Sequence, residues 1–122
     1  MKRAVFEIKI NPVGRYFFVF RDAEGTALVV SKSFGGRSQL EKCLADIRDT
    51  AQIAALKESA KNKTVPPLFR IENDRESYTF ALIGFEGEVI FSSEGYAQRN
   101  DCIAAIELLK KLSFDAGIVD LV

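Results

Sequence analysis

The chain has 122 residues, of which 48% are hydrophobic and 28% charged, the size and balance of one globular domain with an apolar core. Its 17 basic and 17 acidic side chains cancel, so no overall field draws the protein to nucleic acid or to an anionic membrane. Histidine is absent, which removes the most frequent general base and zinc ligand. The chain has no apolar run of membrane-spanning length and no secretory signal pattern, so we expect a soluble cytoplasmic protein.

The first predicted elements are three strands joined by tight turns. Apolar and charged residues alternate over residues 6–10, the period of a strand with one buried face. Turn residues at 11–14 precede an aromatic strand over 15–20, and Gly25 closes the next turn before a third strand over 26–31. The chain therefore opens with a three-stranded antiparallel unit.

A helix follows, because apolar residues recur at helical spacing at Leu40, Cys43, Leu44 and Ile47. Ser38 is its predicted N-cap. The alanine content of residues 51–57 favours a continuation of this helix toward residue 60. Residues 61–67 are polar and then interrupted by prolines, as expected of a linker.

The same order of elements recurs in the second half of the chain. A shift of 62 residues matches six positions: Tyr16 with Tyr78, Phe18 with Phe80, Gly25 with Gly87, Leu28 with Ile90, Ser31 with Ser93 and Phe34 with Tyr96. This repeat predicts strands at 69–71, 77–83 and 88–92, and then a helix with Cys102, Ile103, Ile106, Leu109 and Leu112 on its apolar face, capped by Asn100 or Asp101. The β-branched run within residues 115–122 predicts a short final strand.

Two length differences between the halves are predicted. The first hairpin differs in length by one residue between the halves, because Phe6 matches Phe69 at a shift of 63 in place of 62. Three extra residues fall within 35–38, because Cys43 matches Cys102 at a shift of 59. The two cysteines are therefore expected to be repeat equivalents, both reduced and buried.

The run from Glu86 to Tyr96, followed by Cys102 and Ile106 on a helix, resembles the YegP-like family of small bacterial domains of unknown function. The resemblance covers nearly the whole chain, in both halves. It implies an α+β fold of two tandem β-β-β-α-(β) repeats that share one antiparallel sheet, with the helices on one face and a pseudo-two-fold axis between the repeats. The first repeat departs from the family pattern at residues 32–34 and in its three-residue insertion.

The resemblance further implies that each repeat lends the short strand after its helix to the other. Residues 52–57 would then form a strand that matches 118–121, in place of a longer helix. We therefore expect a single domain over residues 1–122, with repeats at about 4–60 and 68–122 and a linker at 61–67.

The sequence favours a non-catalytic protein. The carboxylate pairs Glu86 with Glu88 and Asp115 with Asp120 fall in turns or near the C-terminus, where solvated charge is the usual role. The neighbouring hydroxyls of residues 92 and 93 have no histidine partner, and no lysine stands at the required spacing. The cysteines stand far apart, which indicates neither a metal cluster nor a redox pair. We expect no catalytic residue, no metal site and no cofactor, and the resemblance supplies none.

Two binding alternatives remain open. Gly35, Gly36, Arg37 and Ser38 precede a predicted helix, where free backbone N–H groups can receive an anion, although the lysine and spacing of a phosphate-binding loop are missing. The other interpretation is a flexible insertion followed by an N-cap serine. Aromatic strand residues with nearby arginines could contact nucleic acid, but the neutral charge disfavours it.

The favoured function is protein association through the outer face of the sheet. Strand alternation directs apolar side chains to the face away from the helices, where polar residues are usual. The candidate interface residues are Phe17, Val19, Val29, Ile83, Val89 and Phe91, with Phe17 and Phe91 as anchors. We expect a second copy or a partner protein to cover this face; the alternative is that loops or the linker cover it within one chain.

Overall fold

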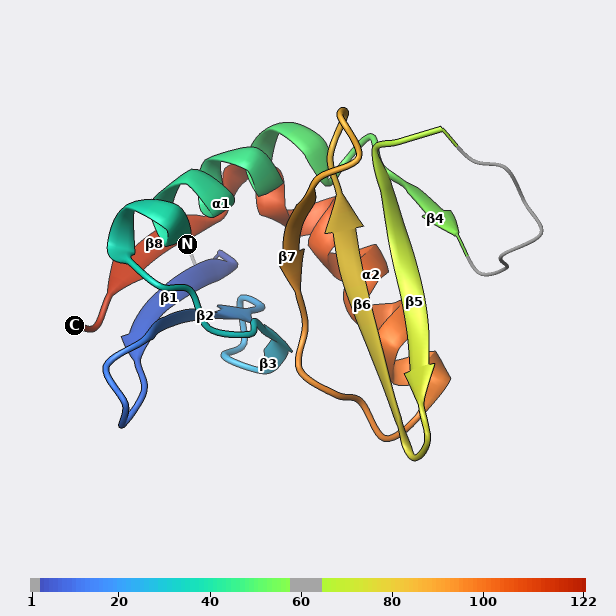
Figure 1. The fold of residues 1–122 in the computed structure, drawn as a ribbon. Helices are drawn as coiled ribbons and strands as arrows, with labels where there is room; N and C mark the ends of the chain where they lie inside the picture. Colours follow the sequence, from blue (N-terminus) through green and yellow to red (C-terminus); the bar gives the residue numbers. More distant parts are fainter. Residues whose placement is uncertain (1–2, 58–64) are drawn as a thin grey trace.

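Two four-stranded sheets and two α-helices form the fold, which the computed structural model describes for residues 3–57 and 65–122 (Figure 1). The α+β class is as predicted. Neither helix in the described ranges has the length and apolar character needed to cross a bilayer. In chain order the elements are β1 (Val5–Ile10), β2 (Tyr16–Arg21), β3 (Ala27–Val30), α1 (Arg37–Thr50), β4 (Ala55–Lys57), β5 (Leu68–Asp74), β6 (Ser77–Ile83), β7 (Val89–Ser92), α2 (Arg99–Leu112), the 3₁₀ turn η1 (Ser113–Asp115) and β8 (Gly117–Asp120).

The strand that follows each helix pairs with the other half of the chain. One sheet has the order β3-β2-β1-β8 and the other β4-β5-β6-β7. The pairings of β8 with β1 and of β4 with β5 are parallel, and the remaining ones are antiparallel. The two exchanged strands lie at opposite outer edges of the molecule (Figure 1). Each sheet is therefore mixed and needs a strand from both halves.

The strand interpretation of residues 52–57 is confirmed at Ala55–Lys57, and the predicted helix continuation is wrong over the described residues. The helix ends at Thr50, and Ala54 donates its N–H back to the Thr50 carbonyl at 3.1 Å in a tight turn. Helix propensity favours alanine by at most about 0.7 kcal/mol over ordinary residues. Complete burial of Ala54 and pairing with β5 outweigh that preference. The remainder of the proposed extension, 58–60, and linker residues 61–64 lie outside the described residues.

The expectation of one shared antiparallel sheet is wrong. Among the described residues, the backbones of the two sheets are joined by one isolated bridge between Ser31 and Ser93, where β3 and β7 approach each other. Lys32 N–H donates to the Ser92 carbonyl and Glu94 N–H to the Val30 carbonyl, at 2.9 and 2.8 Å. Each serine also bonds within its own sheet. The N–H groups of Ser31 and Ser93 donate to the carbonyls of Phe18 and Phe80. Their Oγ atoms accept the N–H groups of the same two phenylalanines, both at 3.0 Å.

A single hydrophobic core joins both sheets and both helices. Helix α1 packs against β2 and β7, and α2 against β3 and β6, so each helix spans the two sheets. The Phe91 ring lies 5.2 Å from that of Phe18 in the first sheet and 5.6 Å from that of Phe80 in its own, both edge-to-face. The inner faces of the two sheets therefore contribute to one core and do not form two separate ones.

The predicted three-residue insertion is wrong, and the two cysteines are not equivalent. Both helices have fourteen residues, and they begin at Arg37 and Arg99, which are 62 positions apart. Cys102 therefore occupies the position of Leu40, while Cys43 matches Ala105. Residues three positions apart lie close to the same face of a helix. Matching the two cysteines therefore still aligned the apolar faces of the helices, but with the second helix shifted by almost one turn. Both thiols are buried, as predicted.

The predicted outward orientation of Val29 and Phe91 is wrong as well. Val29 lies opposite Phe20, and Phe91 opposite Leu82, and directly opposed residues of a sheet share a face. An irregularity in each hairpin follows this pair and inserts one residue, which reverses the alternation that a regular strand would have. Val29 and Phe91 are 1% and 3% exposed and belong to the core.

Candidate functional site between α1 and β8

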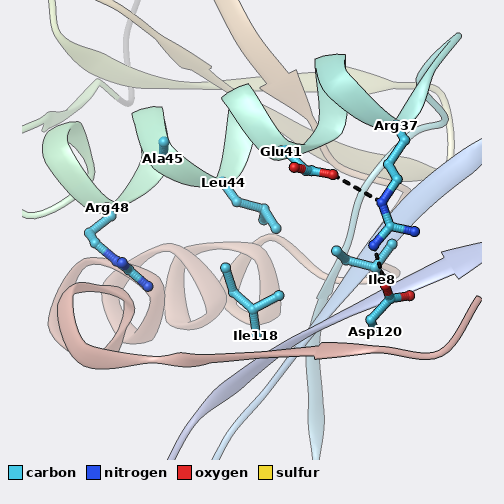
Figure 2. Close-up of a pocket in the computed structure, with 8 residues that line it drawn as sticks. All are labelled: Ile8, Arg37, Glu41, Leu44, Ala45, Arg48, Ile118 and Asp120. Atoms are coloured by element: carbon cyan, nitrogen blue, oxygen red, sulfur yellow. Dashed lines mark hydrogen bonds and ion pairs between the residues drawn. The ribbon is translucent and has the colours of Figure 1, made fainter.

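A pocket of about 330 Å³ lies between the first helix and the exchanged C-terminal strand. Figure 2 shows its lining, which combines apolar and charged side chains from α1, β8 and β1: Ile8, Arg37, Glu41, Leu44, Ala45, Arg48, Ile118 and Asp120. The pocket is therefore built from both halves of the chain, because β8 follows the second helix.

The periodicities of the two elements explain why these side chains meet. Arg37, Glu41, Leu44 and Arg48 recur at steps of three or four and so follow one side of α1. On β8, Ile118 and Asp120 are two residues apart and therefore share the face toward the helix. Arg37 of the helix thus faces Asp120 of the strand, and Leu44 faces Ile118.

An ion-pair cluster occupies one end of the pocket. The Arg37 guanidinium donates to Glu41 Oε1 at 2.9 Å and also to Asp120 Oδ2. The bond from Arg37 lowers the pKa of the Asp120 carboxyl below its ordinary value, and a bond from the Val122 N–H adds to the effect. The same pairing raises the pKa of Arg37. Arg37 therefore connects α1 to β8 and has two carboxylates to balance one positive charge.

The opposite end of the pocket carries Arg48, which has a different role. Its Nη2 donates to the Ala116 carbonyl at 3.2 Å, directly before β8. The second helix repeats this contact, because Lys110, 62 residues later, donates to the carbonyl of Ala54 directly before β4. Each helix thus holds the start of the strand that the other half contributes. Within the described residues, Arg48 forms no ion pair with a carboxylate.

The four residues of the predicted anion-binding loop, 35–38, do not form a common binding site, because α1 already begins at Arg37. Gly36, not Ser38, is the N-cap of α1, and Ser38 is exposed as the second residue of the helix. The Gly35 N–H already donates to Gln39 Oε1 at 3.1 Å, and Arg37 extends toward β8. The second helix also begins earlier than expected, with Gln98 as its N-cap in place of Asn100 or Asp101. Of the predicted loop residues, only Arg37 lines the pocket.

The six candidate interface residues do not form one exposed face. Besides the two that lie in the core, Val19 and Ile83 are each only 5% exposed, and Ile83 packs with Leu68 and Ala81 in a small separate cluster. Phe17 is half-buried, and Val89 is exposed. Association through the outer face stays a prediction, with much less exposed apolar surface than the sequence indicated.

Exposed apolar side chains gather instead along the outer edge of the first sheet. On β8 and just beyond it, Ile118 and Leu121 are 51% and 54% exposed, and Val119 and Val122 are also exposed. No strand of the described residues pairs with β8 on the side away from β1. This edge therefore combines an unpaired backbone with apolar side chains.

Sequence comparison places the chain among known proteins. A model of a domain of unknown function, DUF1508, matches residues 74–120. The UPF0339 protein Atu0232 of Agrobacterium fabrum is 43% identical over 54 residues, which cover 43% of this chain and 87% of the relative. The chain belongs to the YegP-like UPF0339 family. The family resemblance seen in the sequence is thereby confirmed, and the family's function is unknown.

Two solved structures have a similar fold. YegP of Escherichia coli, described as a protein of unknown function, is 19% identical, with a TM-score of 0.67 over 99% of this chain and 95% of its own. The UPF0339 protein SO3888 of Shewanella oneidensis is 16% identical, with a TM-score of 0.71 over 97% of this chain and 91% of its own. At these identities the likeness shows the fold alone.

Both thiols of this UPF0339 chain and the Ser93 hydroxyl are buried. Burial raises the pKa of the Cys43 thiol far above its ordinary value, and it raises that of Cys102 to about 11. The Ser93 hydroxyl is fully buried and accepts a backbone N–H. Among the described residues, no three acidic or cysteine side chains come together as a metal-binding group. Thiolate or serine nucleophilic chemistry therefore has no accessible group at these positions.

Sequence reasoning missed Arg48 and Ile118 because each is ordinary within its own element. Arg48 is one of several charged residues on α1, and Ile118 is one of the β-branched residues of a short strand. The informative signal is the recurrence of a basic residue at 48 and 110, at the same shift of 62 that matches the aromatic strands. Extending that shift through the helices would have revealed it.

Proposed function

We propose that this chain is a cytoplasmic, non-catalytic association module that pairs with a second copy of itself through the free edge of β8. The observation that carries the proposal is an unpaired edge strand with exposed apolar side chains on both of its faces. Edge strands are usually protected by charge, proline or a covering segment, and an exposed apolar edge is a template for strand addition.

The backbone of β8 defines which groups are available. The N–H groups of Gly117 and Leu121 donate to β1, at the carbonyls of Ala4 and Ile8. Because alternate residues of a strand point to opposite sides, the N–H and C=O groups of Ile118 and Asp120 face away from β1. These four groups are the ones that an added strand would bond.

One antiparallel register uses all four groups in both copies. With the two-fold axis at Val119, Ile118 of each copy lies opposite Asp120 of the other, and both pairs are hydrogen-bonded ones. An axis at Asp120 would oppose two carboxylates. An axis at Ile118 would require Ala116, whose N–H already donates to the Ser113 carbonyl. The register centred on Val119 is therefore the favoured one.

Charge and side-chain burial agree with a second copy as the occupant. The chain has a formal net charge of zero, so two copies do not repel each other at long range. In the favoured register the Val119 side chains of the two copies contact each other on one face of the sheet. On the face toward α1, Ile118 of one copy stands opposite Asp120 of the other.

The test is the mass of the intact protein measured by sedimentation velocity over a range of concentrations. We expect a reversible dimer, and we expect Val119→Lys to abolish it, because two lysines would then stand directly opposite each other. Val13→Lys is the matched control, since Val13 is 78% exposed in the turn between β1 and β2, outside β8, and should leave the dimer unchanged. A parent protein that stays monomeric at millimolar concentration, or a Val119→Lys variant that still dimerises, would refute the proposal.

A further inference from the structure

We infer that the pocket between α1 and β8 is a binding site for a small amphipathic carboxylate, a compact apolar body that ends in one anionic group. The inference concerns the side of β8 that faces the helix and does not depend on pairing at the outer edge. The pocket's volume of about 330 Å³ is at the lower end of the range of small-molecule sites.

The middle of the pocket is apolar. Ile8 and Leu44 line it and are 2% and 4% exposed, while Ile118 leaves half of its surface open to solvent. An apolar ligand body in this position would remove the exposed face of Ile118 from water, which favours binding.

The positive end of the pocket is available to an anion. Arg37 is already matched by Glu41 and Asp120, so the cluster of these three groups has a net negative charge. Arg48 uses one N–H for the Ala116 carbonyl, and a guanidinium has five. It retains donors for a carboxylate, with no competing carboxylate bonded to it among the described residues. The charge pattern places the anionic group at Arg48 and the apolar body toward Leu44.

The equivalent positions of the second helix carry a different charge pattern. At the shift of 62, Glu107 occupies the position of Ala45, and Lys110 that of Arg48. A carboxylate at the first of these positions lies one helical turn from the basic residue and would repel an anion there. Ala45 presents only a methyl group to the pocket, which leaves both the space and the positive charge free.

The experiment is an NMR titration of the full chain with hexanoate, followed through the methyl and amide signals. We expect saturable shifts at Leu44, Ala45 and Ile118, with a Kd on the order of 1 mM for so small a probe. Acetate, which has the charge without the body, and hexylammonium, which has the body with the opposite charge, should bind at least about tenfold more weakly. Equal binding of hexylammonium, or hexanoate shifts outside the pocket, would overturn the inference.

Four substitutions separate charge from shape and from folding. Ala45→Glu places the residue of the second half on an exposed helix position and should weaken hexanoate binding about tenfold, whereas Ala45→Gln, of nearly equal size, should weaken it much less. Arg48→Lys, which copies Lys110, should retain binding, and Arg48→Gln should lose it. If Ala45→Glu and Ala45→Gln weaken binding equally, or if Arg48→Gln binds as the parent does, Arg48 does not hold the anion and the inference is wrong.

Discussion

Replacing Phe91 with alanine tests whether one core joins the two sheets. The ring is 3% exposed and contacts Phe18 of the first sheet as well as Phe80 of the second. Its removal leaves a cavity bounded by both sheets, and such Phe→Ala changes cost about 3–5 kcal/mol. Against a total stability of about 5–15 kcal/mol, this is a large share, and it corresponds to a fall in Tm of roughly 12–20 °C.

Urea denaturation, followed by circular dichroism and by tyrosine fluorescence, measures this loss. The parent should unfold in one transition that both probes report at the same urea concentration, and Phe91→Ala should lower its midpoint with little change in slope. Phe85→Ala is the matched control, because Phe85 is 64% exposed in a turn and should change the stability by no more than about 0.5 kcal/mol. A Phe91→Ala loss below about 1 kcal/mol, or dissociation of a dimer without loss of stability, would place Phe91 on an external surface and contradict the core described above.

Three further predictions follow from the exchanged strands and the buried thiols. Residues 1–61 and 62–122, produced separately, should each be less stable than the whole chain, as measured by urea denaturation, because each sheet lacks a strand; two halves that are folded, monomeric and as stable as the whole would contradict this. Cys43 and Cys102 should react slowly with a bulky thiol reagent at neutral pH, and rapid reaction of both would show that they are accessible. Because burial raises the pKa of Cys102 from 9.0 to about 11, its contribution to the free energy of unfolding is complete below pH 9 and is lost as the pH rises toward 11, so Cys102→Ser should reduce that pH dependence.

The strands were the most predictable part of the fold. Alternation at residues 6–10 and the paired aromatic runs correspond directly to β1, β2 and β6. The exchange of β4 and β8 came from the family resemblance, because propensity alone favoured a helix over the alanines of 51–57. Local preference could not reveal it, since the partner of β4 lies beyond the linker and its burial supplies the stabilisation.

One cause of the errors is that a local bulge cannot be seen in a pattern of residue types. A bulge after Phe20 and another after Leu82 reversed the faces of Val29 and Phe91, and no residue type at either hairpin announced it. The pocket was beyond sequence reasoning because Arg37 and Asp120 are 83 positions apart and meet only through the parallel pairing of β8 with β1. The anion-binding loop at 35–38 was predicted from its glycines, whereas the residue of this segment that lines the pocket is Arg37, the first residue of α1.

The pairing of β8 with β1 has a consequence for synthesis of the chain. Arg3 and Asp115, which meet beside that pairing, are 112 residues apart in the sequence. At ribosomal rates, on the order of 10 s pass between the emergence of the first strand and that of the last. During this interval the edge of β1 has no partner within the chain, and unpaired edges are where nascent chains pair wrongly with one another. The first sheet therefore stays incomplete until β8 has left the ribosome.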